Sequence, residues 1–267
     1  MAFPDSDSDG DIAVAVQGAT ITYGDFTSVN NVSVDFPRGK FTCIIGPNGC
    51  GKSTLLRAMA RVLPTEAGTI SLENKEIDSF GRKELSRRIA LMGQDAIAPE
   101  HLTVTELVAR GRFAHLGPLG QRSSQDFDKV SQAISTVELD SLADRRMNEL
   151  SGGQRQRAWL AMALAQDTPV LLLDEPTTFL DLGYQHDLLT LVRNLSKNEH
   201  KTVIAVVHDL QQAIRFADHI VAMQGGELVD HGNPEDIVTA ELIEQLYGLP
   251  VEVTRAGRQG RTVIVPD

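Results

Sequence analysis

The sequence predicts an α/β protein: an open sheet with helices, preceded by an antiparallel β subdomain and interrupted by a small helical insertion. Apolar, strand-like runs alternate with helical segments in the second half of the chain, as in a parallel sheet. Near the N-terminus apolar and polar side chains alternate instead, as in antiparallel strands with one exposed face. A length of 267 residues provides enough core for such a fold without disulfides or metals.

The N-terminal third is expected to supply most of the early strands. Residues 1–11 are acidic and small, so we expect a solvated tail before one domain over 12–267. The alternating pattern runs from Ala13 to Phe36, and the apolar run FTCIIG (41–46) predicts a strand covered on both faces. The other expected elements are a helix over 52–63, which Pro64 helps to end, and strands over 68–77 and 88–93.

After Gln94 the sequence changes character, and about 95–166 is expected to form the helical insertion. Thr103 and Glu106 have the spacing of a capping box, which predicts a helix through about Arg110. Ser124 is expected to cap a second helix that runs through Glu138. The open sheet then resumes, with strands over 170–174, 203–208 and 219–224 and helices over 184–197 and 210–217.

Charge and cysteine content narrow the classes of function. The chain has 25 Lys and Arg against 36 Asp and Glu, and its net charge of −11 disfavours a general nucleic-acid binder. Its two cysteines, Cys43 and Cys50, form no CxxC pair, which favours a reducing, cytoplasmic compartment. The apolar run 158–165 is far shorter than the ~18 residues of a membrane span. We therefore expect a cytoplasmic protein unless a partner holds it at a membrane.

A glycine-rich loop follows the strand at 41–46 and leads into the helix that begins at Lys52. Its residues, in the order G-x-x-x-x-G-K-[ST], are Gly46, Pro47, Asn48, Gly49, Cys50, Gly51, Lys52, Ser53 and Thr54. Glycines let backbone N–H groups close around phosphate oxygens, and the helix N-terminus adds its positive end. We expect Lys52 to neutralise the β- and γ-phosphates of a nucleotide and Ser53 to ligate Mg²⁺. The loop predicts a P-loop NTPase core. Cys50 is expected to fill space in the loop, and its alkylation should obstruct the binding of ATP.

The apolar strand at 170–174 ends in two adjacent carboxylates, Asp174 and Glu175. Acids at strand ends commonly cap the next turn, so this feature alone is weak evidence. Beside a phosphate loop, the two carboxylates become specific evidence for a nucleotide site. Asp174 is expected to hold Mg²⁺ through water, and Glu175 to polarise the water that attacks the γ-phosphate. Neighbouring side chains at a strand end point in different directions, which permits two separate roles.

Ser151, Gly152, Gly153 and Gln154 begin a strongly helical segment. A serine N-cap would explain an isolated Ser-Gly-Gly, but free N–H groups and a hydroxyl at a helix start also form an anion cradle. One triphosphate is already cradled by 46–54. A second cradle is useful if it belongs to another copy of the chain, which faces the first head to tail and grips the same nucleotide.

The succession of these motifs resembles the ATP-binding subunit of ABC transporters over nearly the whole chain. The motifs are 46–54, Gln94, LSGGQ (150–154), LLLDE (171–175) and His208. The resemblance implies the ABC ATPase fold and two ATP molecules sandwiched between two subunits, with Ser151 contacting the γ-phosphate across the dimer. It also implies that Gln94 reaches Mg²⁺ and the attacking water and that His208 contacts the γ-phosphate. Tyr23 matches the aromatic residue that stacks on adenine, although a lone tyrosine in a strand more often packs.

One segment departs from the broader family. After Glu175 the chain reads PTTFLD, where a small residue commonly stands in place of Phe179, and this leaves the packing at the dimer seam open. Asp181 keeps its place, so the resemblance implies that it contacts the partner subunit across the dimer.

A narrower resemblance is to the ATPases of bacterial ferric-siderophore importers, a group that extends to haem and cobalamin uptake. It rests on 106–115, 151–166, 176–181 and 241–253. It implies a peripheral protein at the cytoplasmic face of the bacterial membrane, bound to integral permease subunits and served indirectly by a periplasmic or lipoprotein substrate-binding protein. The permease is expected to dock beside 96–105 and 110–112, where Arg110 and Arg112 could equally solvate a helix end.

Two alternatives stay open at this point. A non-transport ABC ATPase, such as an iron–sulfur cluster assembly subunit, shares the architecture, although its narrower motifs differ from PTTFLD and ELIEQLYGL. A sugar or amino-acid importer ATPase is disfavoured because no extra C-terminal regulatory domain follows.

Overall fold

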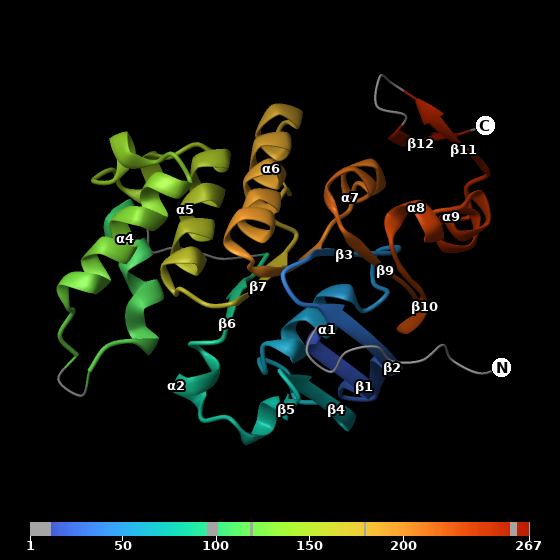
Figure 1. Cartoon of the computed structure of the whole chain (residues 1–267), viewed down its shortest axis with the longest axis horizontal. Helices are drawn as coiled ribbons and strands as arrows, with labels where there is room; N and C mark the ends of the chain where they lie inside the picture. The colour runs from blue at the N-terminus through green and yellow to red at the C-terminus, as the bar shows by residue number, and fades with distance from the viewer. Residues whose placement is uncertain (1–11, 95–100, 118–119, 179, 257–260, 267) are drawn as a thin grey trace.

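The fold consists of two sheets and a set of helices, shown in Figure 1 as a computed structural model. The structure describes residues 12–94, 101–117, 120–178, 180–256 and 261–266. The expected N-terminal tail therefore lies outside the described residues. Within these ranges, no helix is both long and apolar enough to span a bilayer.

The first sheet is antiparallel and has the strand order β2-β1-β4-β5. Its strands are β1 (Ile12–Tyr23), β2 (Phe26–Pro37), β4 (Ala67–Leu72) and β5 (Lys75–Glu76). Buried and exposed residues alternate along β2, which is the pattern of a strand with one face on the core. The antiparallel subdomain predicted from this alternation is confirmed.

The central sheet has the order β10-β9-β3-β8-β7-β6. Its described strands β9, β3, β8, β7 and β6 are parallel, and β10 pairs antiparallel with β9 at one edge. The strands are β3 (Phe41–Ile45), β6 (Ile89–Met92), β7 (Val170–Asp174), β8 (Thr202–Val206), β9 (His219–Gln224) and β10 (Glu227–Gly232). Every residue of β3, β7 and β8 is buried, because helices or the first sheet cover both faces. The predicted open α/β sheet is confirmed.

Alternate residues of these strands enter two separate cores. Ile44, Leu172 and Ile204 face α1 (Lys52–Met59) and the antiparallel sheet. Cys43, Leu171 and Val203 face the other side, where three other helices pack. These are α5 (Gly152–Ala165), α6 (Leu182–Glu199) and α7 (Leu210–Phe216). The central sheet is therefore held rigidly from both faces, which fixes the ends of its strands in space.

The helical insertion contains α3 (Val104–Val108) and α4 (Ser124–Thr136), which pack with α5 to one side of the central sheet (Figure 1). The predicted capping box of Thr103 and Glu106 is confirmed. The predicted cap at Ser124 is wrong by one residue, because Ser123 caps α4. The residue three positions after Ser123 is Asp126, whose carboxylate accepts from the Ser123 N–H. The residue three positions after Ser124 is Phe127, which has no acceptor on its side chain. The Ser123 N–H, together with the Arg112 guanidinium, lowers the pKa of Asp126 to about 2.

Short elements join these layers. They are α2 (Arg82–Leu85) and four 3₁₀ turns, η1 (Ile77–Ser79), η2 (Ala109–Ala114), η3 (Asp140–Leu142) and η4 (Met147–Glu149). The helix expected over 52–63 ends earlier, at Met59. Arg61 adopts a left-handed backbone with φ 53° and its guanidinium donates to the carbonyls of Ile77 and Phe80, so the chain turns toward η1.

The C-terminal part adds elements that the sequence analysis did not predict. They are α8 (Pro234–Ile237), α9 (Ala240–Tyr247) and a separate hairpin of β11 (Val251–Ala256) and β12 (Arg261–Pro266). They lie together on the side of the molecule opposite the helical insertion (Figure 1).

Candidate functional site

The glycine-rich loop joins the buried strand β3 to α1. Gly51 stands at the start of α1 with φ 95°, and a Cβ there would lie 2.3 Å from the carbonyl oxygen of Ser28. Only glycine fits this position, because both the backbone angle and the close approach exclude a side chain. With glycine as its N-cap, α1 receives no side-chain hydrogen bond at its start. Its first N–H groups and its positive end therefore face the loop, which is the arrangement that binds phosphate.

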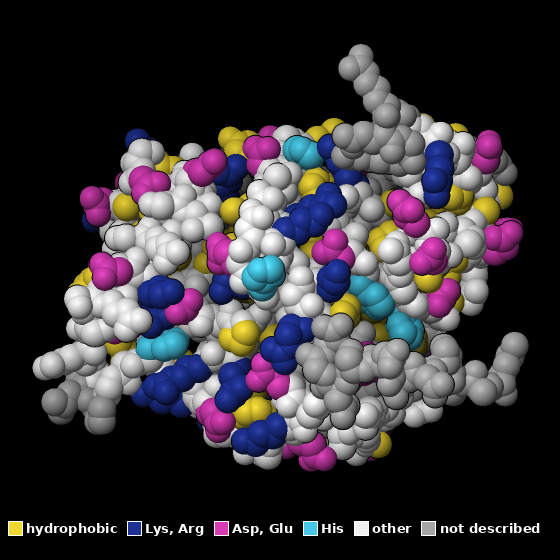
Figure 2. Space-filling view, in the orientation of Figure 1, with side chains coloured by type: hydrophobic (Ala, Val, Ile, Leu, Met, Phe, Trp, Pro, Cys, Tyr) yellow, Lys and Arg dark blue, Asp and Glu magenta, His cyan; other side chains and the backbone are white. Residues whose placement is uncertain are grey.

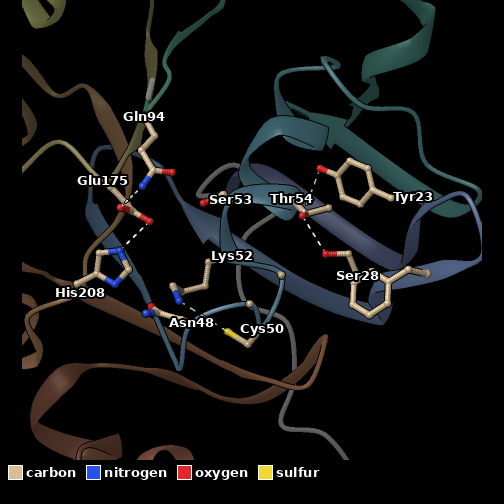
Figure 3. Close-up of a pocket in the computed structure, with 13 residues that line it drawn as sticks. Tyr23, Ser28, Asn48, Cys50, Lys52, Ser53, Thr54, Gln94, Glu175 and His208 are labelled. Carbon is tan, nitrogen blue, oxygen red and sulfur yellow. Dashed lines mark hydrogen bonds and ion pairs between the residues drawn. The ribbon is translucent and has the colours of Figure 1, made fainter. Parts of the chain in front are cut away.

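Lys52 holds its ammonium inside this loop. The side chain is buried, and Nζ donates to the carbonyl oxygens of Gly46 at 2.8 Å and Pro47 at 2.9 Å. Figure 3 shows Lys52 at the centre of the cavity, near Asn48 and Cys50. A triphosphate entering the loop would meet a cation that is already desolvated and aimed into the cradle.

Cys50 is buried at the same place, 3.9 Å from the Lys52 ammonium. Burial raises the pKa of the Cys50 thiol, although the neighbouring ammonium acts in the opposite direction. Cys43 lies in the core, as expected, and burial raises the pKa of its thiol as well. Burial and a raised pKa both make the thiol at position 50 a poor target for alkylation in the folded chain.

Ser53 and Asp174 meet at the start of α1 and the end of β7. The Ser53 hydroxyl donates to Asp174 Oδ1 at 2.6 Å. The second carboxylate oxygen, Oδ2, accepts from Arg57 Nη2 at 3.1 Å and Nε at 3.3 Å. Asp174 is fully buried, so Arg57 supplies the charge that compensates this carboxylate. No local pattern in the sequence points to Arg57, because its partner lies 117 residues away.

Three polar side chains converge from the carboxyl ends of neighbouring parallel strands. Gln94 follows β6, Glu175 follows β7 and His208 follows β8. Glu175 Oε1 lies 2.7 Å from His208 Nε2, and Oε2 accepts from Gln94 Nε2 at 2.5 Å (Figure 3). Thr178 also donates to Oε2, at 3.1 Å. Because the strands of an α/β sheet place their carboxyl ends at one edge, residues distant in sequence become neighbours there.

The backbone of Glu175 itself is unusual. Its φ of 52° lies in the left-handed region, which a non-glycine residue adopts at a cost of about 1 kcal/mol or more. The turn points this carboxylate toward Gln94 and His208 instead of along the strand that ends at Asp174.

A cavity of about 510 Å³ unites the two groups. It is lined by Tyr23, Phe26, Ser28, residues 48–54, Gln94, Glu175 and His208. Tyr23 and Ser28 lie on one side, across from the group around Glu175 (Figure 3). Phe26 and Ser28 were not predicted. The sequence YGDF did contain a signal for Phe26: the Gly-Asp turn places this second aromatic residue opposite Tyr23.

Eight predicted residues do not line this cavity in the described part of the single chain. Gly46, Pro47 and Asp174 lie directly behind it, hydrogen-bonded to the lining residues Lys52 and Ser53. The other five are Ser151, Gly152, Gly153, Gln154 and Asp181. Ser151 is exposed and caps α5, with its hydroxyl accepting from the Gln154 N–H at 3.3 Å. Asp181 is exposed and caps α6 by accepting from the Tyr184 N–H at 3.0 Å. Each side chain therefore has a local structural role, and each is accessible to a second molecule.

The surface expected to dock a permease is only partly described, since residues 96–100 lie outside the described ranges. Arg112 is not available for docking: it is buried, with Nε 2.8 Å from Asp126 Oδ1 and Nη1 donating to the Ala165 carbonyl. The alternative that it solvates a helix end is wrong for the same reason. Arg110 instead lines a cleft of about 350 Å³ with Lys83 and Phe113. Figure 2 shows Lys and Arg side chains gathered around α2 on this part of the surface.

Phe179, the departure from the broader family, lies outside the described residues. The packing at the dimer seam therefore stays a prediction.

Comparison with known proteins places this geometry in a family. Residues 29–178 match the family model described as ABC transporter. The chain is 46% identical, over 92% of its length and 91% of the relative's, to the ferric enterobactin transport ATP-binding protein FepC of Escherichia coli (strain K12). It is 40% identical, over 95% of its length and 93% of the relative's, to the petrobactin import ATP-binding protein FpuD of Bacillus anthracis.

The structural comparison agrees with these matches. The chain is similar to the dimeric ATP-binding cassette MJ0796 in a post-hydrolysis state bound to ADP and Pi. The TM-score is 0.74 at 29% identity, covering 83% of this chain and 98% of the other. The expected ABC ATPase fold is thereby confirmed. The chain belongs to the ABC transporter family, as an ATP-hydrolysing subunit that dimerises and works with membrane permease subunits.

Proposed function

We propose that this chain powers the import of a ferric siderophore through a membrane permease. The observation that supports this cargo is the 46% identity, over nine-tenths of both chains, to a protein named for ferric enterobactin transport. A second relative is named for petrobactin import, so the proposal extends to the class of iron chelates and not to one compound. In such a system the ATPase does not touch the cargo, and specificity lies in the partner proteins.

ATP binding is proposed at the 510 Å³ cavity. Lys52, with its buried ammonium, neutralises phosphate charge, and the first N–H groups of α1 hold the phosphate oxygens. An ammonium about 4 Å from a phosphate charge contributes roughly 4 kcal/mol at an effective dielectric constant of 20. We therefore expect loss of this one side chain to weaken ATP binding or turnover by orders of magnitude.

Mg²⁺ fits the oxygen donors where α1 begins and β7 ends: Ser53 lines the cavity, and Asp174 is its buried hydrogen-bond partner. The Ser53 hydroxyl and the Asp174 carboxylate are oxygen ligands already 2.6 Å apart, and the Gln94 amide lies on the same side of the cavity (Figure 3). Oxygen donors of this kind suit Mg²⁺, which keeps several waters and binds few carboxylates. When bound, the ion neutralises charge on the β- and γ-phosphates. Ser53, Asp174 and Gln94 are the residues that we propose to hold it.

Glu175 is the proposed general base. It must face the water that attacks the γ-phosphate, yet both its carboxylate oxygens are engaged, one by His208 and one by Gln94. Three of the roughly four lone-pair sites of the carboxylate are used, by His208, Gln94 and Thr178, so release of one contact would give the water better access. We propose that His208 leaves Glu175 for the γ-phosphate and that Gln94 orients the water, so the three side chains respond together to the bound triphosphate.

The dimer completes the site in this proposal. Ser151 and the N-terminus of α5 are exposed and outside the cavity, so they can reach a nucleotide only in another subunit. The Ser151 hydroxyl accepts from Gln154 and still has its own hydrogen to donate to a phosphate. Asp181, exposed at the start of α6, is proposed to contact the partner subunit. Two ATP molecules would then lie between two head-to-tail subunits.

The proposed location is the cytoplasmic face of the bacterial membrane, where the chain binds its permease. A periplasmic or lipoprotein substrate-binding protein delivers the cargo from the other side. ATP closes the dimer, hydrolysis reopens it, and Gln94 carries the change to the permease.

Reconstitution tests the cargo. The tagged chain is purified from membranes with its permease, the complex is placed in lipid vesicles, and uptake of ⁵⁵Fe-siderophore is measured beside uptake of haem and cobalamin. We expect ATP-dependent uptake of the ferric siderophore, and none with Glu175→Gln. Uptake of haem or cobalamin alone, or purification with a soluble scaffold in place of a permease, would contradict the proposal.

A further inference from the structure

Two aromatic side chains stand at the tip of the β1–β2 hairpin with little to pack against. Tyr23 ends β1 and Phe26 begins β2, and the two residues are paired directly across the hairpin. Their exposed fractions are 46% and 63%. Only 5% of the residues are aromatic, so two neighbouring exposed rings are unusual in this chain. Both line the cavity that contains residues 48–54.

The two rings differ in how they are held. The Tyr23 hydroxyl accepts from Thr54 Oγ1 at 3.5 Å, which ties this ring to α1. Phe26 has no polar atom with which to form such a bond. Cross-strand neighbours place their Cβ atoms about 5 Å apart, so the two rings together extend one apolar surface at the mouth of the cavity. No functional role was assigned to Phe26 by the motifs in the sequence.

The polar groups beside this surface are already engaged with one another. The hydroxyls of Ser28 and Thr54 lie 2.9 Å apart in a buried contact. Thr54 donates to Tyr23 and Ser28 can donate to Thr54, so both hydroxyl hydrogens are used within this buried group and neither is left to donate to the edge of a base. Recognition at this end of the cavity therefore depends on contact area with aromatic rings, which every base offers and purines offer most.

We propose that Phe26 is a second contact for the nucleobase, which widens the stacking surface of Tyr23 and favours purine over pyrimidine nucleotides. This inference rests on the proposed ATP site. It predicts that Phe26 contributes to the binding of a nucleotide and contributes nothing to the binding of its phosphates, because its cross-strand partner Tyr23 lies across the cavity from the group around Glu175 (Figure 3).

Binding measurements separate the two contributions. Calorimetric titrations with ATP, CTP and inorganic tripolyphosphate are made on the full chain, with EDTA present so that no nucleotide is hydrolysed. For Phe26→Ala we expect ATP binding to weaken at least about fivefold, the lower end of base–aromatic stacking, and the preference for ATP over CTP to shrink. Tripolyphosphate binding should stay within about twofold. Phe26→Tyr, which keeps the ring, should retain ATP affinity.

Phe127→Ala is the matched control, since Phe127 is 58% exposed on α4 and does not line the cavity. We expect it to bind all three ligands as the unmodified chain does. Unchanged ATP affinity in Phe26→Ala would overturn the inference, as would equal weakening of ATP and tripolyphosphate. If the unmodified chain binds neither ATP nor tripolyphosphate, the proposed site fails instead, and the two failures are thus distinguished.

Discussion

The ion pair between Arg57 and Asp174 should stabilise the fold as well as the site. Arg57→Met keeps the unbranched stem and the helix propensity of the side chain but removes the guanidinium. Asp174 is fully buried, and without Arg57 it keeps only the hydrogen bond from Ser53 among its described side-chain partners. Removing one partner of a buried pair leaves the other charge uncompensated, which is costly.

The magnitude follows from the geometry. Two unit charges 3.1 Å apart interact with roughly 5 kcal/mol at an effective dielectric constant of 20. The Arg57 side chain is 36% exposed, so solvent screens part of this interaction and lowers it. We expect the variant to lose about 2–3 kcal/mol of unfolding free energy.

Urea unfolding at pH 7, without nucleotide, measures this loss. Arg38→Met is the matched control, because Arg38 lies 2.8 Å from Glu73 but both side chains are about a third or more exposed. We expect the control to lose less than about 1 kcal/mol. In the Asp174→Asn background Arg57→Met should cost much less, since the buried charge is gone. A loss from Arg57→Met no larger than that of the control would refute the reasoning.

Three further predictions follow from the site and its surroundings. Glu175→Gln should keep ATP binding, slow hydrolysis by about 10²-fold or more and trap a dimer with ATP on size-exclusion chromatography; a monomer with near wild-type turnover would contradict the assigned role. Cys50 should react slowly with iodoacetamide at pH 7 until urea unfolds the chain, as followed by mass spectrometry; labelling of the folded chain at the rate of a free thiol would contradict its burial. Burial and the neighbouring His231 lower the pKa of His219 from 6.5 to about 4, so the unfolded chain takes up the proton first and stability falls as the pH drops from about 6.5 to 4. Urea unfolding of His219→Asn should show a smaller fall over this range, and an equal fall would exclude His219 as its source.

Local patterns in the sequence were sufficient for the central sheet and the phosphate loop. The runs at 41–46, 170–174 and 203–208 predicted buried strands because both faces of these strands are covered, and such strands leave an unbroken apolar signature. Glycine spacing around Lys52 identified the loop for a similar reason, since its backbone geometry excludes side chains at fixed positions.

Contacts between distant segments could not be predicted in this way. The Arg57–Asp174 pair and the engagement of both oxygens of Glu175 depend on which strands are neighbours in the sheet, and no local pattern encodes that order. The C-terminal hairpin of β11 and β12 was not predicted, because each strand has only six residues and most of its described side chains are intermediate or exposed. The family resemblance supplied the roles of Gln94 and His208, which their local sequence alone did not indicate.

A crystal structure of the Glu175→Gln variant with ATP and Mg²⁺ tests the shared site most directly. If two subunits bind each nucleotide jointly, the Ser151 hydroxyl of one will lie within hydrogen-bonding distance of the γ-phosphate held by Lys52 of the other. A closed assembly in which Ser151 is remote from every triphosphate would contradict this account.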